Sequence, residues 1–114
     1  MPRLITATTL FAFVFASLTA AEAQALAKDR ATFNVGTATA TRGQKATGMI
    51  EVPAGIDAGL SIPVAVFHGA KPGPVLALVS GAHGTEYASI IALERLIGLL
   101  NAGEISGTVI IVAR

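Results

Sequence analysis

The stretch VLALVSGAHGTE, residues 75–86, decides the fold predicted for this chain. Its first five residues, 75–79, are continuously apolar, which is typical of a strand covered on both faces in a parallel sheet. The apolar run stops just before Gly81, and a histidine and a glutamate, His83 and Glu86, follow three residues apart. We therefore expect a buried strand that ends in a turn carrying two polar side chains.

The residues after this stretch have the pattern of a helix and a second strand. Within residues 86–101, apolar side chains recur at helical spacing at Ile90, Leu93, Ile97 and Leu100. Residues 101–103 (NAG) are expected to end this helix, because asparagine and glycine adopt positive φ readily. Residues 107–112 (GTVIIV) are again continuously apolar. Strand, helix and strand in this order predict a βαβ unit with parallel strands and a right-handed crossover.

Before the stretch, short β-branched segments predict more strands. Residues 33–40 (FNVGTATA) and 47–52 (TGMIEV) flank a polar turn at residues 41–45. Two strands separated by such a turn can pair as a hairpin.

A further strand is expected at residues 60–67 (LSIPVAVF), between loops rich in proline and glycine at residues 53–59 and 68–74. Pro63 removes one backbone donor from this strand, which favours an edge position or a bulge. Together the segments predict an α/β fold with a mixed, partly parallel sheet.

The N-terminus has the features of a secretory signal peptide. A positive charge near the start precedes a short apolar core at residues 10–18, and small residues follow that allow cleavage near Ala23 or Ala25. We expect residues 1–25 to be removed and the product to be exported, to the periplasm or the medium. A retained anchor is the alternative, because residues 4–21 carry no charge, but their threonine and serine content makes them a poor membrane span.

Composition excludes several classes of function. The chain has 114 residues, a net charge of +1 and no cysteine. The near-neutral charge gives no indication of a nucleic-acid partner, and the lack of cysteine excludes a disulfide scaffold, a thiolate zinc site and a cysteine nucleophile. Ser61 and Ser80 lie in no nucleophile elbow, and the glycines near residue 81 match neither a P-loop nor a dinucleotide fingerprint.

His83 and Glu86 lie where ligand sites form in this class of fold. In open α/β sheets, ligands gather at the carboxyl ends of parallel strands. Imidazole nitrogen and carboxylate oxygen both suit zinc, and a tight turn can aim both side chains at one ion. Gly81 and Gly84 are expected to let the backbone bend there. The sequence therefore predicts His83 and Glu86 as metal ligands.

Simpler explanations of these residues stay open. Glu86 can be an acidic residue in the first helical turn, favoured by the helix dipole, with Thr85 as the N-cap. His83 can be an ordinary loop histidine. His68 precedes a turn rich in proline and glycine and has no carboxylate nearby in the sequence, so we expect it to be a loop histidine.

Residues 61–96 resemble the N-terminal part of the succinylglutamate desuccinylase/aspartoacylase family, relatives of the zinc carboxypeptidases. The matching residues are Gly69 and the sequence PGP at 72–74, followed by an apolar strand and the motif G-x-H-G-x-E that contains His83 and Glu86. A looser similarity extends over residues 47–112. The resemblance implies an incomplete zinc-carboxypeptidase-like fold, with residues 26–114 as the N-terminal part of a catalytic domain.

The resemblance also implies a function. The family hydrolyses amide bonds in N-acylated amino acids or similar small substrates, with esters as an alternative, and His83 and Glu86 would be its first two Zn²⁺ ligands. The family's third ligand, a histidine, and its general base, a glutamate, lie further downstream than these residues. We therefore expect little or no hydrolysis by this chain alone, and no catalytic residue is assigned. The alternatives are a small exported non-enzymatic binding or structural domain and a fragment of a peptide-cleaving zinc carboxypeptidase.

Overall fold

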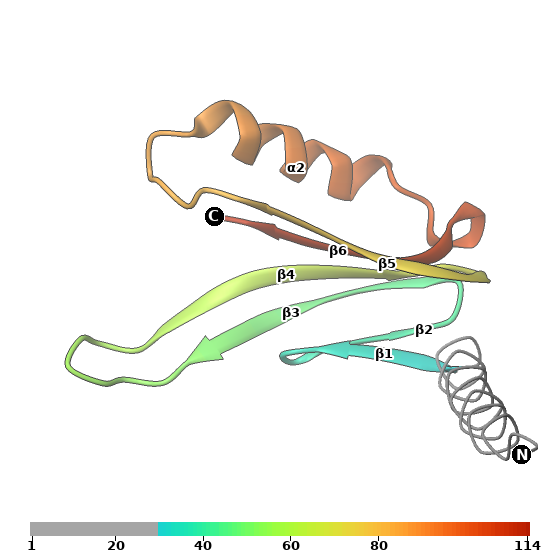
Figure 1. Cartoon of the computed structure of the whole chain (residues 1–114), viewed down its shortest axis with the longest axis horizontal. Coiled ribbons are helices and arrows are strands. Elements are labelled where there is room, and N and C mark those ends of the chain that lie inside the picture. Colours follow the sequence, from blue (N-terminus) through green and yellow to red (C-terminus); the bar gives the residue numbers. More distant parts are fainter. Residues whose placement is uncertain (1–29) are drawn as a thin grey trace, which may run out of the picture. The chain divides into compact units, whose positions relative to one another are not determined.

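A four-stranded mixed sheet lies at the centre of the computed structural model, which describes residues 30–114 (Figure 1). The elements in chain order are β1 (Thr32–Val35), β2 (Ala38–Thr41), β3 (Gln44–Val52), β4 (Leu60–His68), β5 (Lys71–Ser80), α2 (Tyr87–Leu99), the 3₁₀ helix η1 (Ala102–Glu104) and β6 (Ser106–Ala113). The strand order in the large sheet is β3-β4-β6-β5, and β1 and β2 form a separate hairpin. The predicted α/β class with a mixed, partly parallel sheet is confirmed.

The predicted signal peptide, residues 1–25, lies outside the described residues. Among residues 30–114, no helix has the length and apolar character needed to cross a membrane.

The predicted βαβ unit is present. β5 and β6 pair in parallel from Val75 opposite Thr108 to Ser80 opposite Ala113, and α2 connects them. However, β5 begins at Lys71, so the loop predicted at residues 68–74 is mostly strand. Hydrogen bonding to β6 extends the strand through this proline-rich segment, with a register shift between Lys71 and Val75.

The two faces of the sheet pack against different partners (Figure 1). Side chains alternate along a strand, so Ala65 and Phe67 of β4 pack toward α2, whereas Val64 and Val66 pack toward the β1–β2 hairpin. On the helical side the partly buried residues include Leu78, Leu93, Leu96 and Ile97. On the hairpin side the core is completed by Ala38, Ala40, Ile110 and Val112. Apolar burial on both faces holds the centre of the sheet in place.

The N-terminal strands differ from the prediction. The segment 33–40 is not one strand, because the chain reverses at Gly36, whose φ is +55°, and β1 and β2 pair with each other. β3 then pairs along its whole length with β4. The predicted hairpin between residues 33–40 and 47–52 is therefore wrong. The glycine at position 36 was the signal for the earlier turn.

Pro63 lies in β4, an interior strand, but at a position where β4 does not pair with β6. β4 pairs with β6 only over Ala65–His68, so Pro63 lies beyond this segment and faces Met49 of β3 on its other side. The N–H of Met49 donates to Thr37 Oγ1, and its C=O accepts from the Thr37 N–H, both at 2.9 Å. Met49 therefore makes no ladder bond to Pro63, and the missing proline N–H costs no hydrogen bond. The expected edge position or bulge is wrong, because β4 is an interior strand in regular register with β3, but the proline lies where β4 has no partner on its β6 side.

The ends of α2 also differ from the prediction. The N-cap is Glu86 rather than Thr85. At the other end, Leu100 is extended with φ −70°, and no positive φ follows in Asn101. Asn101 instead caps η1, where its Oδ1 accepts from the Gly103 N–H at 3.0 Å. Asn101 therefore begins the 3₁₀ helix as its N-cap and does not end α2.

β5 is not covered on both faces by the described residues. It is the edge strand of the sheet, and Val75, Leu76 and Val79 are each more than half exposed. Its continuous apolar sequence predicted a fully covered strand, and that expectation is wrong for the part of the chain that the structure describes.

Candidate metal centre

The candidate site lies at the carboxyl end of β5, where residues 81–86 connect the strand to α2. Gly81 has φ +80°, and a Cβ there would overlap the carbonyl oxygen of Arg114. The same Cβ position lies 3.3 Å from Ile90 Cδ1 of α2. The connection therefore passes close to the end of β6 and beneath the first turns of the helix, and this path requires glycine.

The second glycine of the motif, Gly84, does not have the role in bending the backbone that was expected. Gly84 does not have positive φ, and a Cβ built on it meets no atom within 4 Å. The bend at the strand end depends on Gly81, and the structure gives no reason for glycine at position 84.

The turn brings the two predicted ligands together. The Glu86 N–H donates to the His83 carbonyl oxygen at 3.2 Å, which closes a turn over these four residues. Across it, His83 Nδ1 lies 3.1 Å from Glu86 Oε1. The side chains are 80% and 46% exposed, so both are accessible to an ion from solution.

The spacing of these two atoms fits a divalent zinc ion. Zinc binds imidazole nitrogen and carboxylate oxygen at about 2.0–2.2 Å, so two ligand atoms in tetrahedral geometry lie about 3.4 Å apart. The separation of 3.1 Å between Nδ1 and Oε1 is that of a hydrogen bond between the two side chains, and it differs from the zinc value by only a few tenths of an ångström. One nitrogen and one oxygen donor are also the chemistry that zinc accepts.

The simpler explanation of Glu86 differs from the structure in the position of the helix start, although Glu86 still lies at the positive end of the helix dipole. Glu86 occupies the N-cap of α2, but its side chain makes no capping hydrogen bond to the helix. Its carboxylate is turned toward His83 instead.

The described residues supply two ligands rather than three. Among residues 30–114, no group of three or more His, Cys, Asp or Glu side chains is arranged to hold a metal ion. His68 cannot complete the pair, because it pairs with Thr108 at the opposite end of β6 from the carboxyl edge.

His68 is not the loop histidine that we expected. It is the last residue of β4 and is 5% exposed. Its Nδ1 lies 2.9 Å from Thr108 Oγ1, and its ring centroid lies 5.9 Å from that of Phe33. These contacts make it a buried structural residue.

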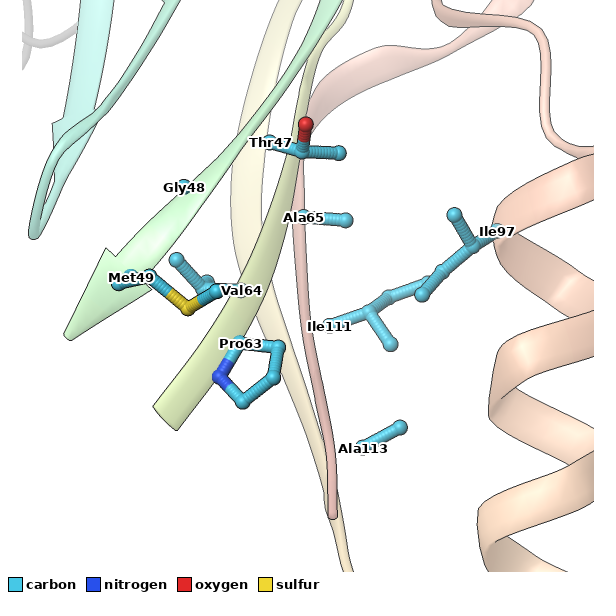
Figure 2. A pocket seen from close by; sticks show the side chains of 9 residues that line it. All are labelled: Thr47, Gly48, Met49, Pro63, Val64, Ala65, Ile97, Ile111 and Ala113. Atoms are coloured by element: carbon cyan, nitrogen blue, oxygen red, sulfur yellow. The ribbon is translucent and has the colours of Figure 1, made fainter. Parts of the chain in front are cut away.

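The structure also contains features that sequence reasoning missed. An apolar hollow of about 260 Å³ lies on the α2 side of the sheet, between β3, β4, β6 and Ile97 (Figure 2). Its lining residues include Thr47, Met49, Pro63, Ala65 and Ile111, and none of its nine residues is ionisable. The hollow therefore offers no acid, base or metal ligand. The second missed feature is Ser80, a buried serine at the end of β5.

Two solved structures are similar to this chain. One is the product-bound structure of the ectoine utilization protein EutE (DoeB) from Ruegeria pomeroyi, with a TM-score of 0.54 and 26% identity over 71% of this chain and 24% of that protein. The other is an aspartoacylase family protein from Mesorhizobium loti, with a TM-score of 0.53 and 28% identity over 74% of this chain and 26% of that protein. No protein-family model and no curated protein sequence matches the chain. The chain thus spans about a quarter of the length of the proteins it matches.

The fold and the position of the His83–Glu86 turn define the class: a mixed α/β structure compatible with part of a zinc-carboxypeptidase-like fold. Within that class, the two similar structures confirm the family resemblance found in the sequence, to the succinylglutamate desuccinylase/aspartoacylase family.

Proposed function

We propose that His83 and Glu86 are the first two ligands of a Zn²⁺ site in a deacylase-type hydrolase. The observation that carries the proposal is the 3.1 Å approach of Nδ1 and Oε1 within one turn at the carboxyl end of a parallel strand. The similarity to an aspartoacylase family protein supports the same assignment. The substrate class is an N-acylated amino acid or a similar small molecule, cleaved at its amide bond.

The residues of this chain have a limited part in that chemistry. Zinc, when bound, supplies Lewis-acid activation of a carbonyl group and of water. His83 and Glu86 hold the ion, and the turn fixes their spacing. A catalytic zinc site needs a third protein ligand and a base near the reacting water. Because residues 30–114 contain no group of three metal-binding side chains, we propose that the chain alone hydrolyses little or no substrate.

The proposed setting is outside the cytoplasm, following the signal peptide predicted for residues 1–25. The proposed partner is the small acylated substrate, with neither nucleic acid nor a stable membrane anchor involved. The net charge of +1 supports the first of these exclusions.

Zinc binding by the purified chain tests the proposal. We expect His83→Ala and Glu86→Gln each to weaken zinc affinity by at least tenfold, because each removes one of two ligands. Glu94→Gln is the matched control for charge: it lies on the exposed part of α2 and should bind as the wild type does. Competition with a chromophoric chelator gives the affinities. Equal affinity in all four proteins would overturn the assignment.

A small non-enzymatic exported domain is the second candidate. It is favoured by one observation, that residues 30–114 lack a group of three metal-binding side chains. Tight zinc binding that depends on His83 would count against a purely structural role for the turn. A peptide-cleaving carboxypeptidase would use the same two ligands, so this experiment does not separate it from a deacylase.

A further inference from the structure

Ser80 has a buried hydroxyl group with no hydrogen-bond partner. The residue is 9% exposed, and its Oγ is the one buried side-chain polar atom of residues 30–114 that lacks a partner. Leaving a buried hydroxyl unpaired destabilises the folded state, and nearly all such groups in folded proteins have a partner. Ser80 Oγ therefore has an unused capacity to donate and accept a hydrogen bond.

The position of Ser80 places this hydroxyl group beside the candidate metal centre. Ser80 is the last residue of β5, three positions before His83. Residues two apart in a strand share a face, and Leu78 packs against the cluster that contains Leu93 and Ile97 of α2. Ser80 therefore lies on the α2 side of the sheet. The short distance from the Gly81 Cβ position to Ile90 Cδ1 shows that the start of α2 covers this strand end.

At that helix start, Glu86 has a second carboxylate oxygen, Oε2, that makes no hydrogen bond to His83 and no capping bond. Its Oε1 faces His83, its side chain makes no cap bond, and its backbone C=O accepts from the Ser89 hydroxyl. Carboxylates that bind metals are generally hydrogen-bonded through outer-shell groups, which orient them. The second carboxylate oxygen, Oε2, can accept a hydrogen bond from such a donor.

We propose that Ser80 is a positioning residue of the His83–Glu86 site: its hydroxyl group donates a hydrogen bond to the Glu86 carboxylate, directly or through one water, when a divalent metal is bound. The inference rests on the proposed function, because it concerns the same metal site. It adds a role for a residue that does not bind the metal.

Zinc affinity and metal-free thermal stability of the purified chain, measured together, test the inference. We expect Ser80→Ala to weaken zinc binding about tenfold, the low end of outer-shell effects. Its metal-free Tm should stay equal or rise, because the unpaired hydroxyl is removed. Ser80→Thr keeps the hydroxyl and should keep the wild-type affinity. Ser106→Ala, an exposed serine at the other end of β6, is the control for the substitution itself.

The outcomes separate this inference from the proposed function. If Ser80→Ala binds zinc as tightly as the wild type while His83→Ala does not, Ser80 has no positioning role and the metal site stands. If the wild type binds no zinc, both are overturned. If Ser80→Ala does not fold, Ser80→Thr and Ser80→Val replace it, since these two side chains have nearly the same shape and differ in the hydroxyl. Equal affinity in that pair would overturn the inference.

Discussion

Gly81 and Gly84 lie in the same turn, but only Gly81 is constrained by its surroundings. We predict that Gly81→Ala lowers the free energy of unfolding by at least about 1–2 kcal/mol, because an L-residue is strained at its positive φ and its Cβ would overlap the Arg114 carbonyl oxygen. Gly84→Ala should change it little, since its Cβ enters open space. Urea denaturation of both variants measures the difference. Equal stabilities would show that the Gly81 backbone relaxes freely.

Single residues were predictable from the sequence where the interaction is local. His83 and Glu86 meet across one turn, so their spacing along the chain was enough to pair them. His68 and Ser80 were not predictable in the same way. The environment of His68 depends on Thr108, forty residues away, and that of Ser80 depends on how α2 lies over β5. Whether a polar side chain is buried depends on residues far away in the sequence, and a local sequence pattern gives no information about them.

The helix α2 is stabilised by one partly buried face, and it contains a destabilising glycine on its exposed side. Gly98 lies on its exposed side, and a Cβ there meets no atom within 4 Å. We predict that Gly98→Ala raises the free energy of unfolding by about 0.5–1 kcal/mol, because alanine loses less backbone entropy in a helix. Ala92→Gly, also exposed on α2, should lower it by a similar amount. Thermal or urea unfolding gives both values, and a Gly98→Ala variant no more stable than the wild type would contradict the prediction.

Whole elements were predicted best where their pattern was strong. The strands at β4, β5 and β6 and the helix between them follow from apolar runs and helical spacing. The missed features are element boundaries and pairing partners. β3 pairs with β4 rather than with residues 33–40 because Gly36 turns the chain early, and β5 extends back to Lys71 because β6 hydrogen-bonds to it. Both outcomes depend on which strands become neighbours.

The molecule as a whole exposes an apolar sheet edge at β5. Unpaired backbone groups on such a strand favour association with another chain. We predict that the purified chain self-associates with rising concentration and that Val79→Lys weakens this, because Val79 is 69% exposed on the edge strand. Leu99→Lys adds the same charge at an 81% exposed position on α2 and should have less effect. Sedimentation velocity over a concentration series measures both, and equal effects would rule out β5 as the contact.

The order β3-β4-β6-β5 also has a consequence for when the protein folds. β6 is the latest of these strands along the chain, yet it lies between β4 and β5 and joins them. Until residues 106–113 have been synthesised, the β3–β4 hairpin and β5 have no shared partner, and the closure of long-range contacts is a slow step. A nascent chain that has not yet released residues 106–113 from the ribosome therefore cannot form the four-stranded sheet, and its β4 and β5 remain unjoined.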